Sequence, residues 1–139
     1  NLADVLSITG YTVTGVTDTV TGRQSYAPTA SMIIWTDIHT NGTRWQAGLF
    51  AGFNKNRGTT EMMKNPMAPI YGLSGDVVLV YRISPRLIYN TGKMRFAAEV
   101  EYTGAEFASP KSDRDQNGLP LNTKEVVNIR GLLAAYYFF

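Results

Sequence analysis

The stretch Lys93-Met-Arg-Phe-Ala-Ala-Glu-Val-Glu-Tyr-Thr103 decides the fold, because its side chains alternate between two kinds. Every second residue is apolar, and the charged residues all fall between them. The apolar set is Met94, Phe96, Ala98, Val100 and Tyr102, and the other set is Arg95, Ala97, Glu99, Glu101 and Thr103. A period of two is typical of a β-strand with one apolar and one polar face. The stretch therefore predicts an amphipathic strand.

The segment Val77–Tyr89 alternates in the same way and predicts the partner strand. Residues Asn90 to Lys93, between the two, have the composition of a hairpin turn. With Thr91-Gly92 as a two-residue loop, both faces agree on one register. The opposed pairs are then Tyr89 with Met94, Leu87 with Phe96, Ile83 with Val100 and Tyr81 with Tyr102 on the apolar face, and Arg82 with Glu101 and Ser84 with Glu99 on the polar face.

A second hairpin is predicted upstream, where Asn41-Gly42 is the usual sequence of a two-residue type I′ turn. Its register sets Ile38 opposite Trp45 and Ile34 opposite Leu49. The apolar residues of these two strands again share one face, while the other face is mixed.

Two further strands complete a set of about six. Leu6–Gly15 is rich in Thr and Val but alternates loosely, whereas Glu125–Phe139 alternates throughout. The connections alternate between the two short turns and three long polar segments, which are Thr17–Ser25, Lys55–Pro69 and Ala108–Thr123. Strict alternation of short and long connections predicts an up-and-down meander.

Composition separates a membrane barrel from most soluble domains. Charged residues make up 17% of the chain, against roughly 25% in soluble globular proteins. The longest apolar run, Gly131–Phe139, is far shorter than the roughly 20 residues of a spanning helix. A barrel wall exposes only every second residue to lipid and so combines few charges with no long apolar run.

The predicted fold class is therefore all-β, a transmembrane antiparallel up-and-down β-barrel, with residues 1–139 forming the C-terminal segment of one barrel domain. Single-chain bacterial barrels have at least eight strands. Six strands predict a part of a larger barrel or several chains sharing one barrel. Short turns of such barrels are periplasmic, which places both hairpin turns and the C-terminus on that side. The expected membrane girdle is Trp45, Phe53, Tyr89, Tyr102, Tyr137 and Phe139.

Three segments carry a family resemblance. The ending Leu133-Leu-Ala-Ala-Tyr-Tyr-Phe-Phe139 resembles the C-terminal signal of Gram-negative outer-membrane β-barrels. The segments Gly92–Thr103 and Gly48–Lys55 look like closing strands of large porin-like proteins of Bacteroidetes-type bacteria. The resemblance implies a bacterial outer-membrane location amid the lipid bilayer and lipopolysaccharide. It also implies recognition of the last strand by the outer-membrane assembly machinery, a water-filled channel for passive diffusion of small hydrophilic solutes, and often a homotrimer.

The face opposite the lipid supplies the candidate pore-lining residues, which are Arg44, Arg82, Arg86, Arg95, Glu99, Glu101 and Arg130. Arginine exceeds the acidic residues here, and this predicts a mild preference for anionic solutes. Arg86 has Ala97 opposite it in the expected register and should be free, whereas Arg82 should be partly neutralised by Glu101. The alternative is that these charges pair only to stiffen the wall.

Neither catalysis nor a cofactor is expected from this sequence. It has no nucleophile elbow, no P-loop and no dinucleotide-binding glycine motif, and no cysteine. His39 is the only histidine, while catalytic zinc usually needs three protein ligands. Asp113–Gly118 resembles the start of a calcium loop, but Lys124 occupies the position of the closing glutamate. We expect a solvated extracellular loop there and no metal.

Two classes of binding function are weighed against the channel. The basic residues are scattered and the net charge is only +2, so no nucleic-acid partner is expected. A soluble antiparallel β-barrel or sandwich binding domain would have strands of the same period. The two differ in where the apolar face points, toward lipid or toward a core, and the alternation of connection lengths with the terminal Phe favours the channel.

Overall fold

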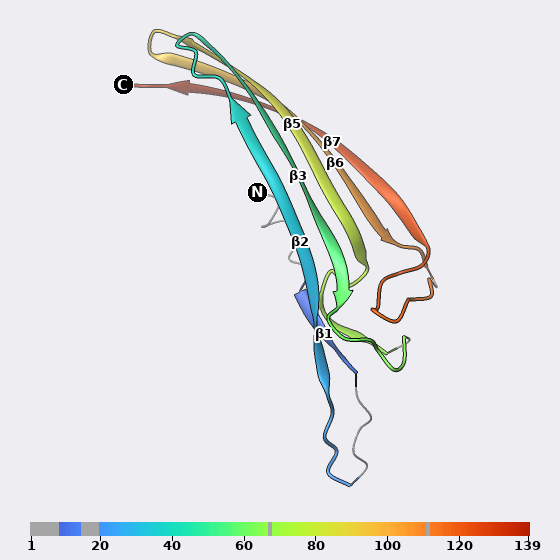
Figure 1. Ribbon diagram of the computed structural model, residues 1–139. Helices are drawn as coiled ribbons and strands as arrows, with labels where there is room; N and C mark the ends of the chain where they lie inside the picture. The colour runs from blue at the N-terminus through green and yellow to red at the C-terminus, as the bar shows by residue number, and fades with distance from the viewer. Residues whose placement is uncertain (1–8, 15–19, 67, 111) are drawn as a thin grey trace.

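The computed structural model describes residues 9–14, 20–66, 68–110 and 112–139, and all regular structure in this part is β-strand. The strands form one antiparallel sheet that curls like part of a barrel wall (Figure 1). They are β1 (Thr9–Val13), β2 (Tyr26–His39), β3 (Trp45–Thr59), β4 (Ile70–Leu73), β5 (Val77–Thr91), β6 (Met94–Ala108) and β7 (Thr123–Tyr137). The all-β antiparallel prediction is confirmed.

The strand order across the sheet is β4-β1-β2-β3-β5-β6-β7. It is a meander except at β4, which pairs with β1 at one edge and leaves β3 to pair with β5. The predicted count of six strands is too low, because Ile70-Tyr-Gly-Leu73 is too short to reveal a period of two. The predicted first strand contains β1, while its residues 6–8 and 15 lie outside the described part.

One end of the sheet is here named the hairpin end. It carries the β2–β3 and β5–β6 connections together with the C-terminus, whereas the β1–β2, β3–β4 and β6–β7 connections lie at the opposite loop end (Figure 1). The β4–β5 connection, residues 74–76, is also short, so the predicted strict alternation of short and long connections holds only when β4 is left out of the meander.

The β5–β6 hairpin turns one residue later than predicted. Thr91 pairs with Met94, so the loop is Gly92-Lys93, and Gly92 adopts a φ of 55° that suits glycine at the first loop position. Tyr89 consequently pairs with Phe96 rather than Met94. The register moves by two residues, and an even shift leaves every side chain on its predicted face.

The β2–β3 connection is longer than the predicted two-residue turn. Ile38 pairs with Leu49 and Ile34 with Phe53, a shift of four residues from the predicted register. Thr40 closes the loop instead, since its N–H donates to the Ala47 carbonyl at 2.8 Å and its Oγ1 accepts from the Ala47 N–H at 2.9 Å. Such side-chain closure competes with ordinary turn geometry. Because this shift is also an even number of residues, each side chain stays on its predicted face.

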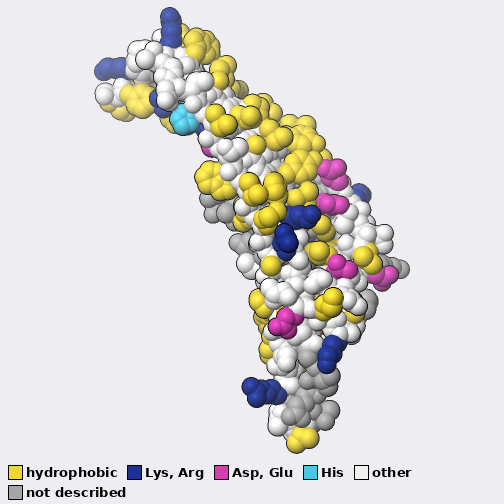
Figure 2. Space-filling view, in the orientation of Figure 1, with side chains coloured by type: hydrophobic (Ala, Val, Ile, Leu, Met, Phe, Trp, Pro, Cys, Tyr) yellow, Lys and Arg dark blue, Asp and Glu magenta, His cyan; other side chains and the backbone are white. Residues whose placement is uncertain are grey.

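One face of β2, β3, β5, β6 and β7, here named the apolar face, carries no charge along its central rows. Its members are Ile34, Thr36, Ile38, Trp45, Ala47, Leu49, Ala51, Phe53, Tyr81, Ile83, Pro85, Leu87, Tyr89, Phe96, Ala98, Val100, Tyr102, Ile129, Gly131, Leu133, Ala135 and Tyr137. Hydrophobic side chains form a band along the strands in Figure 2, with charged side chains gathered toward its ends.

The apolar face is open rather than packed into a core. Ile38 is 66% exposed and Leu133 is 88% exposed. Among the described residues the buried hydrophobic side chains are only Ala27, Met63, Val77 and Val80. The burial expected of a soluble domain is therefore missing from this sheet.

Candidate functional site

The opposite face of the same five strands, here named the polar face, holds six of the seven predicted lining residues. Arg82 and Arg86 lie on β5, Arg95, Glu99 and Glu101 on β6, and Arg130 on β7. Side chains alternate between the two faces along each strand, and directly opposed residues share a face. In the observed register all six residues therefore lie on one side of the sheet. Their grouping by face follows from the period of two, whereas their pairing depends on the register.

Glu101 lies between two arginines. Its Oε2 is 2.5 Å from an Arg130 guanidinium nitrogen, and its Oε1 is 3.4 Å from Arg82. Arg130 is directly opposite Glu101, but Arg82 is opposite Thr103 and donates from Nε to the Thr103 Oγ1 at 2.9 Å. The predicted Arg82–Glu101 contact is present, although it runs diagonally rather than straight across.

Arg86 is paired, contrary to the prediction that it is free. Its guanidinium is 2.5 Å from the Asp37 carboxylate on β2, two strands away. The side chain reaches there by crossing β3 over Gly48, which has no side chain to block it. Glu99 lies directly opposite Arg86, yet within the described residues it has neither an ion pair nor a hydrogen bond.

Two of the predicted lining arginines lie at the hairpin end. Arg44 is in the β2–β3 connection, where it donates to the Tyr89 hydroxyl at 3.0 Å and lies 5.6 Å from the centre of that ring. Because Tyr89 belongs to the apolar face, Arg44 stands apart from the other arginines. Arg95 donates from Nε to Asn90 at 2.8 Å and lies over the Phe138 ring.

A hollow of about 340 Å³ lies on the polar face between these ion pairs. Its lining includes Trp35, Phe50 and Ser84, none of which the sequence singled out as a site residue. The two aromatic rings stack with centroids 6.5 Å apart and an interplanar angle of 22°. Ser84 is 1% exposed, and its Oγ has no hydrogen-bond partner among the residues that the structure describes. In the sequence, the sign that could have drawn attention to Trp35 and Phe50 was that aromatic residues interrupt the polar face.

The predicted girdle residues fall into two groups along the apolar face. At the hairpin end, Trp45 and Tyr89 have ring centroids 4.5 Å apart, and Tyr137 and Phe139 are 5.2 Å apart. Nearer the loop end, Tyr102 lies 6.1 Å from Tyr81. Phe53 is the register partner of Tyr81. Tyr81 therefore belongs with this group, although the sequence did not assign it there.

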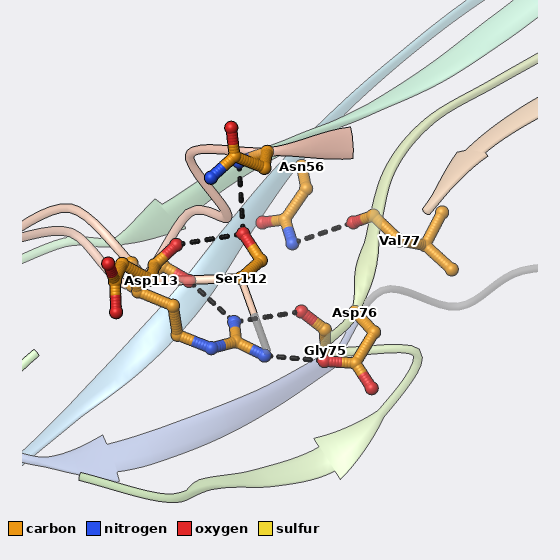
Figure 3. A network of polar contacts seen from close by, with 9 residues as sticks. Asn56, Gly75, Asp76, Val77, Ser112 and Asp113 are labelled. Carbon is orange, nitrogen blue, oxygen red and sulfur yellow. Dashed lines mark hydrogen bonds and ion pairs between the residues drawn. The ribbon is translucent and has the colours of Figure 1, made fainter. Parts of the chain in front are cut away.

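A network of polar contacts ties the β6–β7 connection to the β4–β5 connection at the loop end (Figure 3). Arg114 donates to the carbonyls of Gly118 and Gly75 and pairs with Asp76 at 2.5 Å. The Asp115 Oδ1 accepts from the backbone N–H groups of Asn117 and Leu119, at 2.9 and 2.8 Å. Polar groups of the Asp113–Gly118 segment, which resembles the start of a calcium loop, therefore bond to the loop's own backbone.

Two features are absent from the described part of the chain. No group of three or more His, Cys, Asp or Glu residues there is arranged to hold a metal ion. The described residues also include no helix of the length and hydropathy needed to cross a bilayer.

Comparison of the chain with protein-family models, curated proteins and solved structures finds no match.

Proposed function

We propose that this chain forms part of the wall of a bacterial outer-membrane β-barrel, and that the barrel is a porin-like channel for small hydrophilic solutes. The observation that carries the proposal is the division of one curled sheet into an exposed face without charges and an opposite face with paired charges. Lipid-facing and lumen-facing residues alternate in this way along the strands of membrane barrels.

The aromatic groups support a membrane of ordinary thickness. Trp45 and Phe53 stand eight residues apart on β3, and Tyr89 and Tyr81 stand eight apart on β5. At about 3.3 Å per residue and a tilt of 35–45°, this separation is roughly 20 Å along the membrane normal, near the ~25 Å apolar band of such barrels. Lys55 on β3 and Glu125 on β7 mark the start of the charged rim at the loop end.

Strand length argues against the soluble alternative, a barrel or sandwich binding domain. Strands β2, β3, β5, β6 and β7 have 14 or 15 residues each, whereas strands of globular proteins are usually 3–10 residues long. A membrane strand needs about 9–11 residues to cross the hydrocarbon. The remaining residues then extend past the bilayer at the loop end.

The polar face would line the water-filled interior. Along the central rows its charges are four arginines (Arg82, Arg86, Arg95, Arg130) against three carboxylates (Asp37, Glu99, Glu101), which leaves an excess of one positive charge there. We therefore propose a weak preference for anions. No catalytic role is part of the proposal.

The partners follow from the same placement. An open sheet edge is not viable in lipid, so further strands from this protein or another copy must complete the wall beside β7 and along β2, which β1 covers only at Tyr26–Pro28. Lipid and lipopolysaccharide would cover the apolar face, and the assembly machinery would receive β7. A homotrimer and a periplasmic position of the hairpin end belong to the same proposal.

Extraction followed by planar-bilayer recording tests this function on the complete protein. The protein should remain in the membrane pellet until detergent is added, and the purified barrel should conduct ions in steady steps. A protein that stays dispersed and folded in buffer would reject the membrane placement. A folded, inserted barrel without conductance would reject the channel alone.

A further inference from the structure

The hollow on the polar face contains features that a plain diffusion wall does not need. Trp35 is 63% exposed and stacks on Phe50, so a flat aromatic surface stands on the water side of the proposed wall. Apolar rings facing water are unfavourable unless something covers them. Two adjacent rings in a polar hollow therefore point to a bound molecule with an apolar face of its own.

Ser84 adds a second and independent indication. It lies on β5 between Arg82 and Arg86 and opposite Phe50, and it borders the hollow. Its hydroxyl is buried and has no hydrogen-bond partner in the described part of the chain. Buried polar groups in proteins are nearly always hydrogen-bonded, so an unsatisfied one calls for a missing partner. A ligand hydroxyl in the hollow would supply it.

The charged groups of the hollow narrow the class of ligand. Arg82 is close to Glu101, and Arg86 to Asp37, so each donor has an acceptor beside it. A hydroxyl group both donates and accepts, and neighbouring hydroxyls fit such mixed pairs. An anion would be attracted by the arginines but repelled by the carboxylates beside them. The hollow is lined by two arginines and three carboxylates, and Arg130 pairs with one of these carboxylates from outside the lining, so no net positive charge favours an anion here.

We propose that this hollow is a binding subsite for one ring of an uncharged saccharide. The C–H face of the sugar would lie on Trp35 and Phe50, whose ring faces carry negative charge density. The ring hydroxyls would meet Ser84 and the two ion pairs. The volume of about 340 Å³ lies at the lower end of the roughly 300–1,000 Å³ usual for ligand pockets. The inference rests on the proposed function in that water must reach the polar face.

Tryptophan fluorescence of the complete protein in detergent tests the subsite, since this chain has two tryptophans on opposite faces. Three neutral trisaccharides, maltotriose, cellotriose and xylotriose, serve as probes, with sodium citrate and choline chloride as charged controls. At least one trisaccharide should change the emission saturably. The change should persist in Trp45→Phe and disappear in Trp35→Phe. Ser84→Ala, with little change in volume, should weaken binding about three- to tenfold.

Several results would overturn the subsite. These are the absence of a saturable change with all three trisaccharides, saturable binding of citrate or choline in their place, or an undiminished change in Trp35→Phe. An affinity unchanged in Ser84→Ala, in protein whose gel mobility shows a folded barrel, would also reject it. Conductance measured on the same preparations separates the two proposals. Sugar binding without conductance rejects only the channel, and conductance without sugar binding rejects only the subsite.

Discussion

Arg86 lies directly over Gly48, so closely that a Cβ at residue 48 would come within 2.5 Å of the arginine Nε. The absence of that one side chain lets an arginine on β5 cross β3 and pair with Asp37 on β2. Glu99, which faces Arg86 across the β5–β6 pair, is left without an ion pair among the described residues. A glycine thus decides which of two carboxylates the arginine neutralises.

The first prediction is that Asp37 and Glu99 are alternative partners of Arg86. In Asp37→Asn the arginine can turn to Glu99, and in Glu99→Gln the native pair is kept, so each single change should alter the free energy of unfolding only slightly. The double variant leaves Arg86 without either carboxylate. Its loss in free energy of unfolding should exceed the summed losses of the two single variants by about 0.5 kcal/mol. Urea titration in lipid vesicles measures this coupling. Strict additivity would show that Glu99 cannot replace Asp37.

A second prediction concerns two glycines on the apolar face. The Tyr81 ring lies over Gly104 and its hydroxyl donates to Glu125 at 2.5 Å, whereas nothing lies within 4 Å of a Cβ added at Gly131. Gly104→Ala should displace the ring and lower the free energy of unfolding by about 1–3 kcal/mol. Gly131→Ala should instead raise it by up to roughly 1 kcal/mol, because glycine weakens a strand interior.

The same urea titration measures both glycine variants. Equal effects of the two substitutions would contradict the position of Tyr81 across β6. Tyr81→Phe provides a further check, since it keeps the ring over Gly104 and removes only the hydrogen bond to Glu125. Tyr81→Phe should lower the free energy of unfolding by less than Gly104→Ala does, because it removes one hydrogen bond and displaces no side chain.

Engineered disulfides test the register of the β5–β6 hairpin. This chain has no cysteine, so a pair can be introduced at Leu87 and Ala98, which are register partners. Directly opposed residues lie at Cα distances that a disulfide can bridge. Leu87→Cys with Ala98→Cys should cross-link under mild oxidation, and Leu87→Cys with Phe96→Cys should not. Faster cross-linking of the second pair, followed by mass spectrometry of the linked peptides, would contradict the observed register.

The faces of the strands could be predicted from the sequence because alternation survives errors in the turns. Both hairpins close differently from the prediction, one at Gly92-Lys93 and one through the Thr40 side chain. Each error moves the register by an even number of residues, and Val100 and Arg82 accordingly keep their predicted faces. The strand β4 was missed because four residues carry too little pattern.

The pairing of charges could not be predicted, since it depends on geometry that only the register supplies. Arg86 was expected to be free because Ala97 stood opposite it, and the importance of Gly48 becomes visible only when β3 is placed beside β5. Trp35 and Phe50 were missed for a related reason. Aromatic residues on a polar face look like imperfect alternation until the structure brings them together at 6.5 Å.

The central claim is that the apolar face meets lipid and the polar face meets water, and two neighbouring leucines on β7 test it most directly. Leu133 lies on the apolar face opposite Ala98, and Leu132 on the polar face opposite Glu99. The measurement is the free energy of folding of Leu133→Arg and Leu132→Arg into lipid vesicles.

We expect Leu133→Arg to make folding into vesicles less favourable by about 2–3 kcal/mol, which is the cost of an arginine on the lipid face near the middle of a barrel wall. Leu132→Arg should change the free energy by less than about 1 kcal/mol, because its guanidinium can reach water and the unpaired Glu99. Equal losses in the two variants, or a larger loss in Leu132→Arg, would contradict the assignment of the two faces.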